Sequence, residues 1–548
     1  MQGERRNVHS QLTGFGRRLQ SIFLRSSQTH ERSRVQRKPK TAVENAVESS
    51  RLDKLRNIEK LGVDPWGQRF DGHMSIQTIL QLPADLPEDQ RPGVKAAGRI
   101  VSRRIGGKVH WLDLRDWSGQ LTTRKTTSDD DKHEASEFTD WSSRIQIMLG
   151  QKQIGEIGWA LAQELDLGDL VGIEGKFGKT KRGEPTIFAE KLTFLSKSLE
   201  PHPDKWSGLS DMEYRLRHRY LDLTYNPELL DRALKRVKII RTIRSYLDGQ
   251  GFCEVETPTL HAIAGGAAAR PFKTHHNALD IPLFLRIALE LHLKRLLVGG
   301  MERVYEIGRV FRNEGISQKH NPEFTMLELY QAYGNYESMM DLTEGMVLAA
   351  IDAIGGGYQR SYGTQAIDFS PPWARLAYGD AFQQHVGISM HDEAAVKDAA
   401  QKTHLAIAGK HHDVLVHELF EHKVEHKLTG PVFVHDYPAA LCPLTKRKAA
   451  MPTLAERFEL YIHGMELANA YTELNDPIMQ EQTFSQQLAG LPEEDSMAKM
   501  DHDFIRAQRH GMPPAGGLGV GIDRLVMLLT NTQTIRDVIL FPLLRPEK

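Results

Sequence analysis

The sequence predicts an α+β protein with two folded units, a small β-barrel followed by a larger unit of helices around an antiparallel sheet. Three observations lead to this fold class. The chain has 548 residues, too many for one hydrophobic core. Short alternating segments recur between about residues 93 and 198, which is typical of a barrel. Beyond residue 213, long helical patterns alternate with apolar strands.

The composition is that of a globular protein, with 40% hydrophobic and 26% charged residues. Lys+Arg 70 nearly cancels Asp+Glu 71, so the net charge does not indicate a nucleic-acid partner. Only Cys253 and Cys442 are present, which disfavours a disulfide framework or a cysteine zinc site and favours the reducing cytoplasm. No apolar run approaches the roughly 20 residues that cross a bilayer, so we expect no membrane partner.

Residues 1–48 form a predicted basic, disordered extension. The first 40 residues hold ten Lys/Arg against only Glu4 and Glu31, and their few apolar residues cannot offset the cost of ordering the backbone. Three interpretations remain open: an organelle transit peptide, a basic arm that meets RNA phosphates, or a segment without essential function. A secretory signal is disfavoured because no continuous apolar stretch follows the charges.

A short helical segment, 49–92, comes next. Leu52, Leu55, Ile58 and Leu61 recur every three residues after Ser49-Ser50, and Gly62 ends the pattern. This spacing predicts a capped helix over 51–62.

The barrel is predicted over residues 93–198, with strands at 94–101, 109–114, 145–149, 170–177 and 186–195. The tripeptide Asp116-Trp117-Ser118 recurs as Asp140-Trp141-Ser142, and the stretch between the copies is polar. A hairpin loop usually has two to five residues, so the stretch near 119–142 is predicted to be an insertion that loops out between two paired strands.

A linker over 199–213, marked by Pro201, Pro203 and Gly208, precedes the large unit over 214–548. Its predicted helices include 229–248, 289–298 and 336–354. Residues near 375–428, rich in Ala, His and Lys, are predicted to be a helical insertion.

A long-looped hairpin in this unit has an unusual inner face. Residues 303–314 are predicted as one strand, 315–322 as the loop, and a second strand follows. A purely structural sheet would seldom bury so many functional groups, because each must be paired. One face would present Gly308, Val310, Arg312 and Glu314 together with Phe324, Met326, Glu328 and Tyr330, and the loop contains Lys319, His320 and Asn321.

A second predicted hairpin joins residues 457–462 to 465–473 through the turn His463-Gly464. That turn would pair Tyr461 with Glu466 and leave Glu459 diagonal to Glu466, about 7–8 Å away. Two such carboxylates repel unless a cation lies between them, and Mg²⁺ with nucleotide phosphates is the natural candidate. The alternative is that both are solvated surface acids.

A glycine-rich strand, 516–521, leads into an apolar helix, with Arg524 at the transition. Glycines at alternate strand positions allow a ligand to approach closely, although this pattern is weak evidence alone.

Together these segments resemble the class II aminoacyl-tRNA synthetases, specifically the subgroup with an oligonucleotide-binding barrel before the catalytic domain. The resemblance runs from about residue 51 to 548. The three class motifs correspond to residues 252–258 (F-C-E-V-E-T-P), 311–324 and 519–524 (G-V-G-I-D-R). The markers of the lysyl type are residues 265–272, 274–279 and 312–326.

The resemblance implies an N-terminal OB-fold β-barrel that binds the anticodon, followed by a class II antiparallel-sheet catalytic domain with flanking helices. It implies a ligase that activates lysine with ATP and transfers it to the 3′ end of tRNA(Lys), releasing AMP and pyrophosphate. The implied catalytic residues are Arg312 and Arg524, and the implied ATP-binding residues are Arg312, Glu314, His320, Asn321, Phe324, Glu459 and Arg524. Glu459 and Glu466 would hold Mg²⁺, and lysine would bind Gly266, Glu290, Glu328, Tyr330, Asn469 and Glu473.

The resemblance further implies a homodimer formed through the first motif, and it suggests anticodon contacts at Trp111 and Arg115. Two alternatives remain at this stage. One is a paralogue that lysylates a protein, although such relatives lack a barrel. The other is a non-catalytic RNA-binding derivative, which the presence of Arg312, Glu459, Glu466 and Arg524 disfavours.

Overall fold

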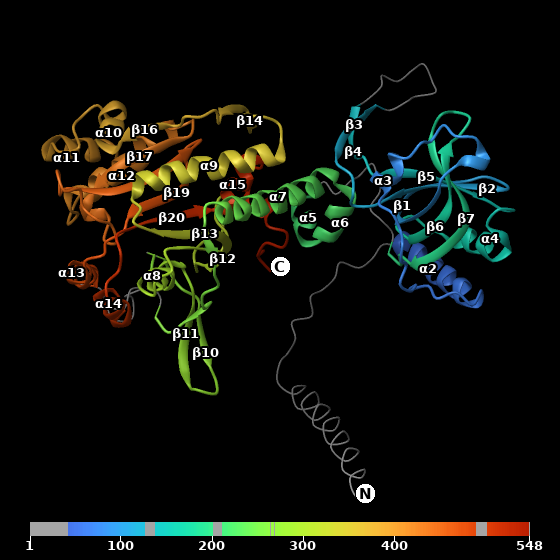
Figure 1. Cartoon of the computed structure of the whole chain (residues 1–548), viewed down its shortest axis with the longest axis horizontal. Coiled ribbons are helices and arrows are strands. Elements are labelled where there is room, and N and C mark those ends of the chain that lie inside the picture. Colours follow the sequence, from blue (N-terminus) through green and yellow to red (C-terminus); the bar gives the residue numbers. More distant parts are fainter. Residues whose placement is uncertain are drawn as a thin grey trace, which may run out of the picture. The chain divides into compact units, whose positions relative to one another are not determined.

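The computed structural model describes residues 42–125, 137–200, 211–263, 265–267, 269–488 and 501–546. The chain divides into two compact units (Figure 1). One takes in Met1–Asp116, Ile145–His202 and Arg545–Lys548, and the other takes in Trp117–Arg144 and Pro203–Leu544.

The first unit is built on a closed five-stranded barrel, which confirms the predicted fold of this region. All five predicted strands are present, in the barrel order β1-β2-β5-β7-β6. The alternation of apolar and polar residues along the strands explains why the sheet closes around an apolar interior. The buried residues of this core include Leu112, Leu114, Ile145 and Ile147, each between less buried neighbours. The strands are β1 (Gly93–Ile105), β2 (Val109–Arg115), β5 (Arg144–Gly150), β6 (Leu170–Lys179) and β7 (Pro185–Ser196).

Helices cover this barrel core. They are α2 (Ala42–Lys60), α3 (Ile76–Leu80) and α4 (Gly155–Glu164), with the short 3-10 helix η1 (Glu88–Gln90). The helix predicted over 51–62 is found in α2, and it ends before Gly62 at φ 73°. It begins at Ala42 rather than after Ser50, because Ala, Val and Glu continue a helix-forming stretch. The predicted disordered extension therefore stops short of residue 48, and residues 1–41 lie outside the described part.

The predicted insertion leaves the barrel. Its described residues form a separate two-stranded sheet of β3 (Leu121–Lys125) and β4 (Glu137–Trp141), while β2 and β5 are neighbours in the barrel. This hairpin contacts helix α7 of the second unit, in which it is grouped. Residues 126–136 of the insertion lie outside the described part of the chain.

The second unit is organised by one eight-stranded sheet in the order β16-β17-β18-β19-β20-β13-β12-β8 (Figure 1). Its neighbouring strands are antiparallel except for β16 with β17 and β12 with β8. The strands are β8 (Cys253–Glu254), β12 (Arg303–Phe311), β13 (Glu323–Ala332), β16 (Ala374–Ala377), β17 (Val432–Pro438), β18 (Leu454–Ile462), β19 (Met465–Thr472) and β20 (Ala515–Gly521).

Helices α7, α9 and α15 pack on one face of this sheet and form the largest core. The apolar positions Ile239, Ile243 and Leu247 of α7 recur at helical spacing and meet Met339 and Met346 of α9. The other, more polar face packs against α8 through a smaller apolar cluster and carries the buried carboxylates of Glu328 and Glu459. The bounds are α5 (Met212–Arg217), α6 (Arg219–Tyr225), α7 (Pro227–Gly249), α8 (Glu290–Val298), α9 (Tyr336–Ile354), α13 (Pro477–Leu488), α14 (His502–Arg509), α15 (Ile522–Leu529) and α16 (Ile535–Val538).

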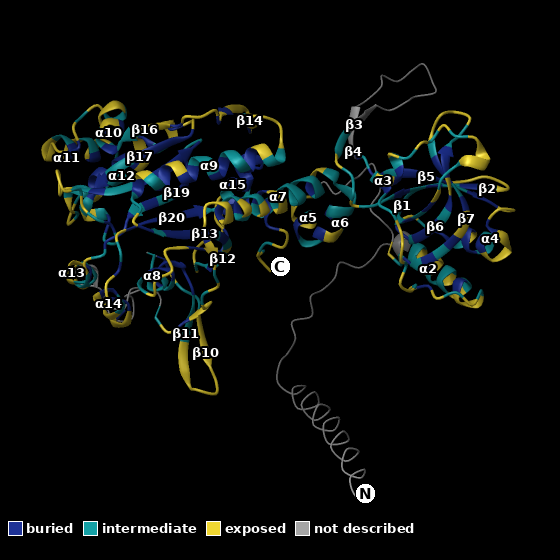
Figure 2. Ribbon diagram, viewed as in Figure 1, coloured by how far each residue is buried: buried dark blue, intermediate teal, exposed yellow. Residues whose placement is uncertain are grey.

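The predicted linker over 199–213 lies mostly outside the described residues, since 201–210 are not described and α5 already starts at Met212. The remaining strands form two small sheets, of which the β10–β11 hairpin is largely exposed (Figure 2). They are β9 (Leu260–His261), β10 (Lys273–His276), β11 (Ile281–Leu285), β14 (Gln359–Tyr362) and β15 (Gln365–Asp368).

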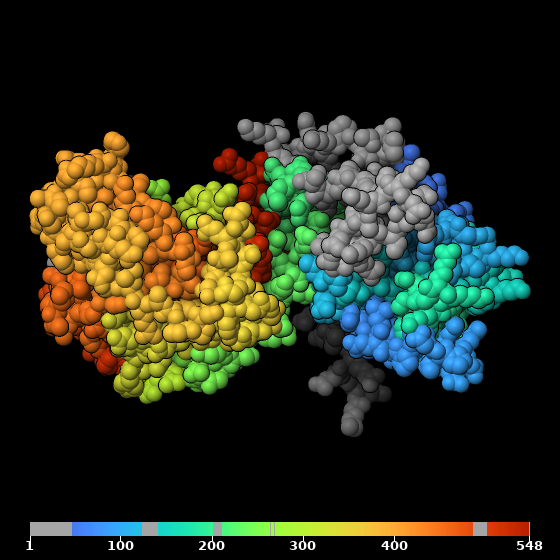
Figure 3. All heavy atoms as spheres, turned by 90° about the horizontal axis from the view of Figure 1, so that it is seen from above, coloured from blue at the N-terminus to red at the C-terminus, as the bar shows by residue number. Residues whose placement is uncertain are grey.

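The helical insertion predicted near 375–428 is present between β16 and β17. It has its own apolar core, in which Tyr378 stacks on Phe420 with ring centroids 4.2 Å apart. Its atoms, orange in Figure 3, gather into one continuous mass. The helices are α10 (Tyr378–Val386), α11 (Glu393–Lys402), α12 (His412–Lys423) and η2 (Glu425–Lys427), and η3 (Ala439–Leu441) follows β17.

None of the helices in the described residues has the length and apolar character needed to span a membrane.

Candidate active site

A cavity of about 170 Å³ opens on the polar face of the sheet, where β13, β19 and β20 lie side by side. The loop after β12 and the first turn of α15 complete its wall. It contains every predicted ATP residue except Glu459, together with Glu466 and Asn469. The predicted members of the lining are Arg312, Glu314, His320, Asn321, Phe324, Glu466, Asn469 and Arg524.

Arg312 and Phe324 form one side of this cavity. Strand β12 ends at Phe311, and Arg312 follows it at the start of the loop, where its backbone N–H donates to Pro322 O at 2.8 Å. The Arg312 guanidinium lies over the Phe324 ring, 5.2 Å from its centroid. A planar aromatic ring beside a permanent cation suits a heteroaromatic group that carries phosphate.

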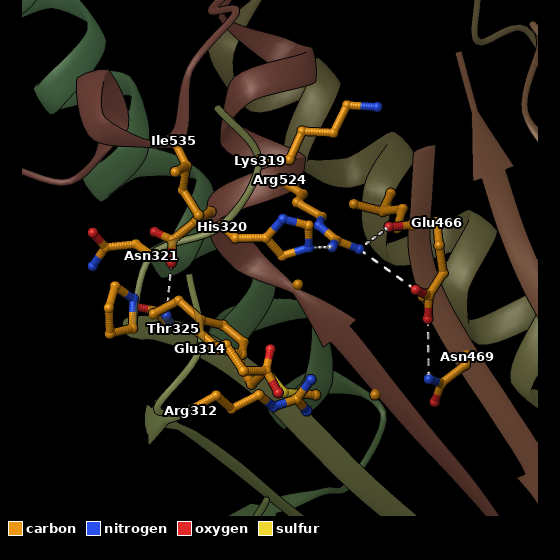
Figure 4. Close-up of a pocket in the computed structure, with 18 of the residues that line it drawn as sticks. Arg312, Glu314, Lys319, His320, Asn321, Thr325, Glu466, Asn469, Arg524 and Ile535 are labelled. Atoms are coloured by element: carbon orange, nitrogen blue, oxygen red, sulfur yellow. Dashed lines mark hydrogen bonds and ion pairs between the residues drawn. The ribbon is translucent and has the colours of Figure 1, made fainter. Parts of the chain in front are cut away.

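Arg524 forms the opposite side and is held by two contacts (Figure 4). It donates to the backbone oxygen of Glu466 at 2.7 Å and lies 3.5 Å from that residue's carboxylate. Its other nitrogen lies 3.3 Å from His320 Nε2. Burial and the adjacent Arg524 lower the pKa of His320, which keeps the imidazole neutral at pH 7. The cavity therefore presents two guanidinium cations, and the Glu466 carboxylate lies beside one of them, Arg524.

Asn321 supplies a buried acceptor with no partner among the described residues. Its Nδ2 donates to Glu323 O at 2.7 Å, whereas its Oδ1 accepts no hydrogen bond. Buried polar atoms are normally paired, so this oxygen is available to a donor on a ligand.

Glu459 lies on the same sheet face but does not line the cavity. The predicted pairs Ile462–Met465 and Tyr461–Glu466 are confirmed, and a β-bulge then places Asn469 opposite Glu459. The Glu459 carboxylate bonds Arg457 and accepts from Tyr437 at 2.9 Å and Tyr461 at 2.5 Å. Burial opposes ionisation, but Arg457 and the two hydroxyls hold the pKa of Glu459 below its usual value.

The two carboxylates differ in how well they fit a metal ion. Glu466 is partly exposed at the cavity and accepts from Asn469 Nδ2 at 3.2 Å, so it keeps acceptor positions open to the cavity. Glu459 has one of about four acceptor positions left. Within the described residues no three His, Cys, Asp or Glu side chains cluster as a metal site. Mg²⁺ bound mainly by nucleotide phosphates needs only one or two carboxylates, so the residues present fit it.

A second cluster, the acid pocket, brings together Glu290, Glu328 and Glu473, each of them buried. Glu290 begins α8, and Lys294, one turn later on the same helix, donates to its Oε1 at 2.5 Å. The same Lys294 ammonium lies 2.5 Å from Glu473 Oε2. Glu328 accepts from the backbone N–H of Leu289 at 3.1 Å, which places it beside the start of α8.

Two glycines of β20 show how closely the predicted lysine residues converge. A Cβ at Gly517 would lie 1.9 Å from Glu473 Oε1 and 2.6 Å from Tyr330 Cε1. A Cβ at Gly519 would lie 3.5 Å from Asn469 Oδ1 and 3.9 Å from Glu328 Cγ. Glycine at position 517 therefore leaves the side chains room to meet, whereas a Cβ at position 519 would make only ordinary contacts.

Gly266 also belongs to this group. It has φ 86°, which favours glycine, and a Cβ there would lie 3.4 Å from Glu290 Cβ. The structure thus brings all six predicted lysine-binding residues together.

Burial changes the ionisation of the acid pocket. Burial raises the pKa of Glu473 to about 8, although the ion pair with Lys294 acts to lower it. Burial and the neighbouring Glu290 raise the pKa of Glu328 to about 7. Neither oxygen of Glu473 accepts a hydrogen bond of regular geometry from the described residues. A cation with several N–H donors would satisfy these carboxylates and favour their charged forms.

The sequence analysis missed two cations, the buried Lys294 and the partly buried Arg457. Lys294 could have been found, because it lies four residues after Glu290 on a predicted helix and so shares its face. Arg457 alternates with Glu459 on β18, but its role depends on Tyr437 of another strand, for which the sequence gives no signal.

The fold and these two adjoining sites correspond to one class of protein. Residues 211–545 match the family model described as tRNA synthetases class II (D, K and N).

Similar proteins share most of the chain. A lysine–tRNA ligase of Moorella thermoacetica is 46% identical over 515 residues, which cover 93% of this chain and 100% of that protein. A lysine–tRNA ligase of Pelotomaculum thermopropionicum is 47% identical over 512 residues, covering 92% of this chain and 96% of that protein. The chain belongs to the lysine–tRNA ligase family of the class II tRNA synthetases.

Proposed function

We propose that this protein activates lysine with ATP and transfers the lysyl group to the 3′ end of tRNA(Lys), releasing pyrophosphate and then AMP. The observation that carries the proposal is a pocket of three buried carboxylates beside a cavity walled by two arginines. A lysine ammonium that leaves water needs anionic partners, which Glu290, Glu328 and Glu473 offer, with Gly266, Tyr330 and Asn469 around them.

In the first step, the lysine carboxylate attacks the α-phosphorus of ATP and pyrophosphate leaves. The carboxylate is already ionised at neutral pH, so no general base is required. Arg312 holds the α-phosphate, since its guanidinium lines the ATP cavity and also acts electrostatically on Glu328 in the acid pocket. Phe324 stacks on the adenine, beside Glu314, His320 and Asn321, and Arg524 holds the far phosphates. Catalysis then rests on positioning and charge stabilisation.

Glu466, with Glu459 behind it, would hold Mg²⁺ against the phosphates. The ion would neutralise charge on the phosphate oxygens as pyrophosphate leaves. Asn469 fixes the Glu466 carboxylate, and Arg457, Tyr437 and Tyr461 keep Glu459 ionised.

In the second step, the terminal ribose hydroxyl of tRNA takes the lysyl group from the adenylate and AMP leaves. The barrel would bind the anticodon by stacking bases on aromatic rings. Supporting this, Trp111 and Arg115 alternate with the buried Leu112 and Leu114 on β2. They therefore lie on the outer face of that strand.

We also propose a homodimer that forms through the first motif. Its strand β8 is the exposed edge of the eight-stranded sheet, and Cys253 and Glu254 are exposed there. An unpaired edge offers backbone groups to a second copy. Both cysteines are free, which supports action in the cytoplasm.

The decisive test is Glu473→Gln, assayed by lysine-dependent ATP–pyrophosphate exchange. Removing one buried anion should raise the lysine KM by about tenfold or more, with the ATP KM nearly unchanged, because charged hydrogen bonds contribute about 1.5–3 kcal/mol. Glu481→Gln, which removes only a surface ion pair with Arg509, is the control. Equal loss for both substrates would contradict the assignment of the acid pocket to lysine.

The same assay separates the two alternatives. Exchange without any charging of tRNA(Lys) would indicate a paralogue that lysylates another acceptor. No exchange with lysine in the unmodified protein would indicate a non-catalytic derivative.

A further inference from the structure

Lys294 is a fully buried ammonium inside the pocket proposed for a substrate ammonium. Its exposed fraction is 0%, and it lies 2.5 Å from carboxylate oxygens of both Glu290 and Glu473. Its ammonium is also 5.8 Å from the centre of the Tyr330 ring. A lysine is rarely buried unless it is paired, and here both partners belong to the predicted substrate site.

We propose that Lys294 is a positioning residue for substrate lysine: it acts as the permanent counter-ion of the acid pocket, pairing with Glu290 and Glu473 and holding them at the correct spacing before lysine arrives. This inference rests on the proposed function, since it concerns how that same site takes its amino acid.

Geometry fixes the position of this counter-ion. Glu290 and Lys294 are separated by four residues on α8, so they share one helix face and move together. Glu473 follows β19 and is tied to the sheet by its backbone N–H, which donates to Ala515 O at 2.8 Å. The ammonium therefore sets the spacing between a carboxylate on a helix and one on the sheet.

The charge balance explains why a resident cation is useful. The three glutamates can carry three negative charges, Lys294 supplies one positive charge, and free lysine brings two ammonium groups. The three pocket carboxylates are then matched by three ammonium groups, while the carboxylate of lysine is directed to the ATP cavity; without Lys294 the three buried carboxylates would repel one another and take up protons.

The ionisation of the side chains agrees with this balance. Burial alone would lower the pKa of Lys294, but Glu290 and Glu473 raise it above its ordinary value, so the ammonium stays charged. Burial raises the pKa of Glu473 despite Lys294, so loss of the ammonium would raise it further. The charged or titratable groups that face Glu473 and its neighbours are Glu290 and Lys294 of α8, Glu328 and Tyr330 of β13, Tyr471 of β19, Arg457 of β18, and Arg312.

The test compares Lys294→Met with the unmodified full chain in lysine-dependent pyrophosphate exchange between pH 7 and 9. Methionine keeps the length of the side chain and removes its charge. At pH 7 the lysine KM of the variant should rise by about tenfold or more, since each unit of raised carboxyl pKa costs a factor of ten in the ionised fraction. The ratio of variant to unmodified KM should fall toward one by pH 9, and the ATP KM should stay constant.

A matched control is Lys235→Met. It removes an ion pair of the same four-residue spacing, Lys235 with Asp231 at 2.7 Å, from the half-exposed surface of α7. Its lysine KM ratio should stay near one at every pH. If Lys294→Met does not fold, Lys294→Gln carries the same expectation.

Three outcomes overturn the inference. An unchanged lysine KM would mean that the ammonium has no role in binding, and a lower KM would mean that it competes with substrate. A loss that is equal at pH 7 and pH 9, or shared by ATP, would indicate a merely structural residue. Absence of exchange in the unmodified protein would instead remove the proposed function itself.

Discussion

Gly517→Ala should damage lysine recognition selectively. The added Cβ would lie 1.9 Å from Glu473 Oε1 and 2.6 Å from Tyr330 Cε1, where an ordinary contact begins at 3.4 Å. The carboxylate oxygen must therefore move by about 1.5 Å, the difference between the first and last of these distances. Overpacking of this kind costs about 1–3 kcal/mol, which corresponds to roughly a 5- to 150-fold change.

The assay is lysine-dependent pyrophosphate exchange with each substrate varied in turn. The lysine kcat/KM should fall within that range, while the ATP KM stays close to its original value, because Phe324 and Arg524 contact neither added atom nor displaced side chain. Gly430→Ala, outside the cavity, is the steric control. Its Cβ would meet nothing within 4 Å, so its lysine KM should change by no more than about twofold. An unchanged lysine KM in Gly517→Ala, or an equal loss for ATP, would refute the packing argument.

Two further predictions concern protons and metal. The lysine KM should fall as the pH rises from about 6 to 8. The raised pKa values of Glu328 (about 7) and Glu473 (about 8) mean that both carboxyl groups hold protons at the lower pH, and these protons must leave before the substrate ammonium can pair with them. A lysine KM that does not change with pH would contradict this. Glu466→Gln should raise the Mg²⁺ concentration for half-maximal exchange severalfold, since magnesium uses one or two carboxylates beside phosphate; an unaltered Mg²⁺ requirement would remove Glu466 from the metal site.

Much of the fold could be predicted because its periodicities are local. Barrel strands β2 and β5 alternate buried and less buried residues, and the helix 336–354 has its predicted bounds because Asn335 caps it and Gly355 ends it. The start of α2 was placed too late because Ser50, a common capping residue, lies inside the helix. The preference of serine for helix caps does not end a helix when helix-forming residues lie on both sides of it.

The site could be predicted less completely, because its members meet through tertiary structure. The period of two correctly placed Phe324, Glu328 and Tyr330 on one face of β13. The same rule could not reveal that Tyr437 would bond Glu459, because the period of a strand does not say which strand pairs with it. Helical spacing places Lys294 beside Glu290, but only the folded structure shows that the same ammonium also reaches Glu473.

The bulge in β19 changes which residues can cooperate. In a regular strand, residues three apart point to opposite faces, yet Glu466 and Asn469 are hydrogen-bonded because Leu467 and Ala468 both turn to the apolar core. The additional residue of the bulge thereby lets Glu466, the candidate metal ligand, accept a hydrogen bond from Asn469, which is proposed to bind lysine. The length of this hairpin is consequently as constrained as its composition. Removing one residue from β19 would place Glu466, proposed for the ATP-bound metal, and Asn469, proposed for lysine, on opposite faces of the sheet.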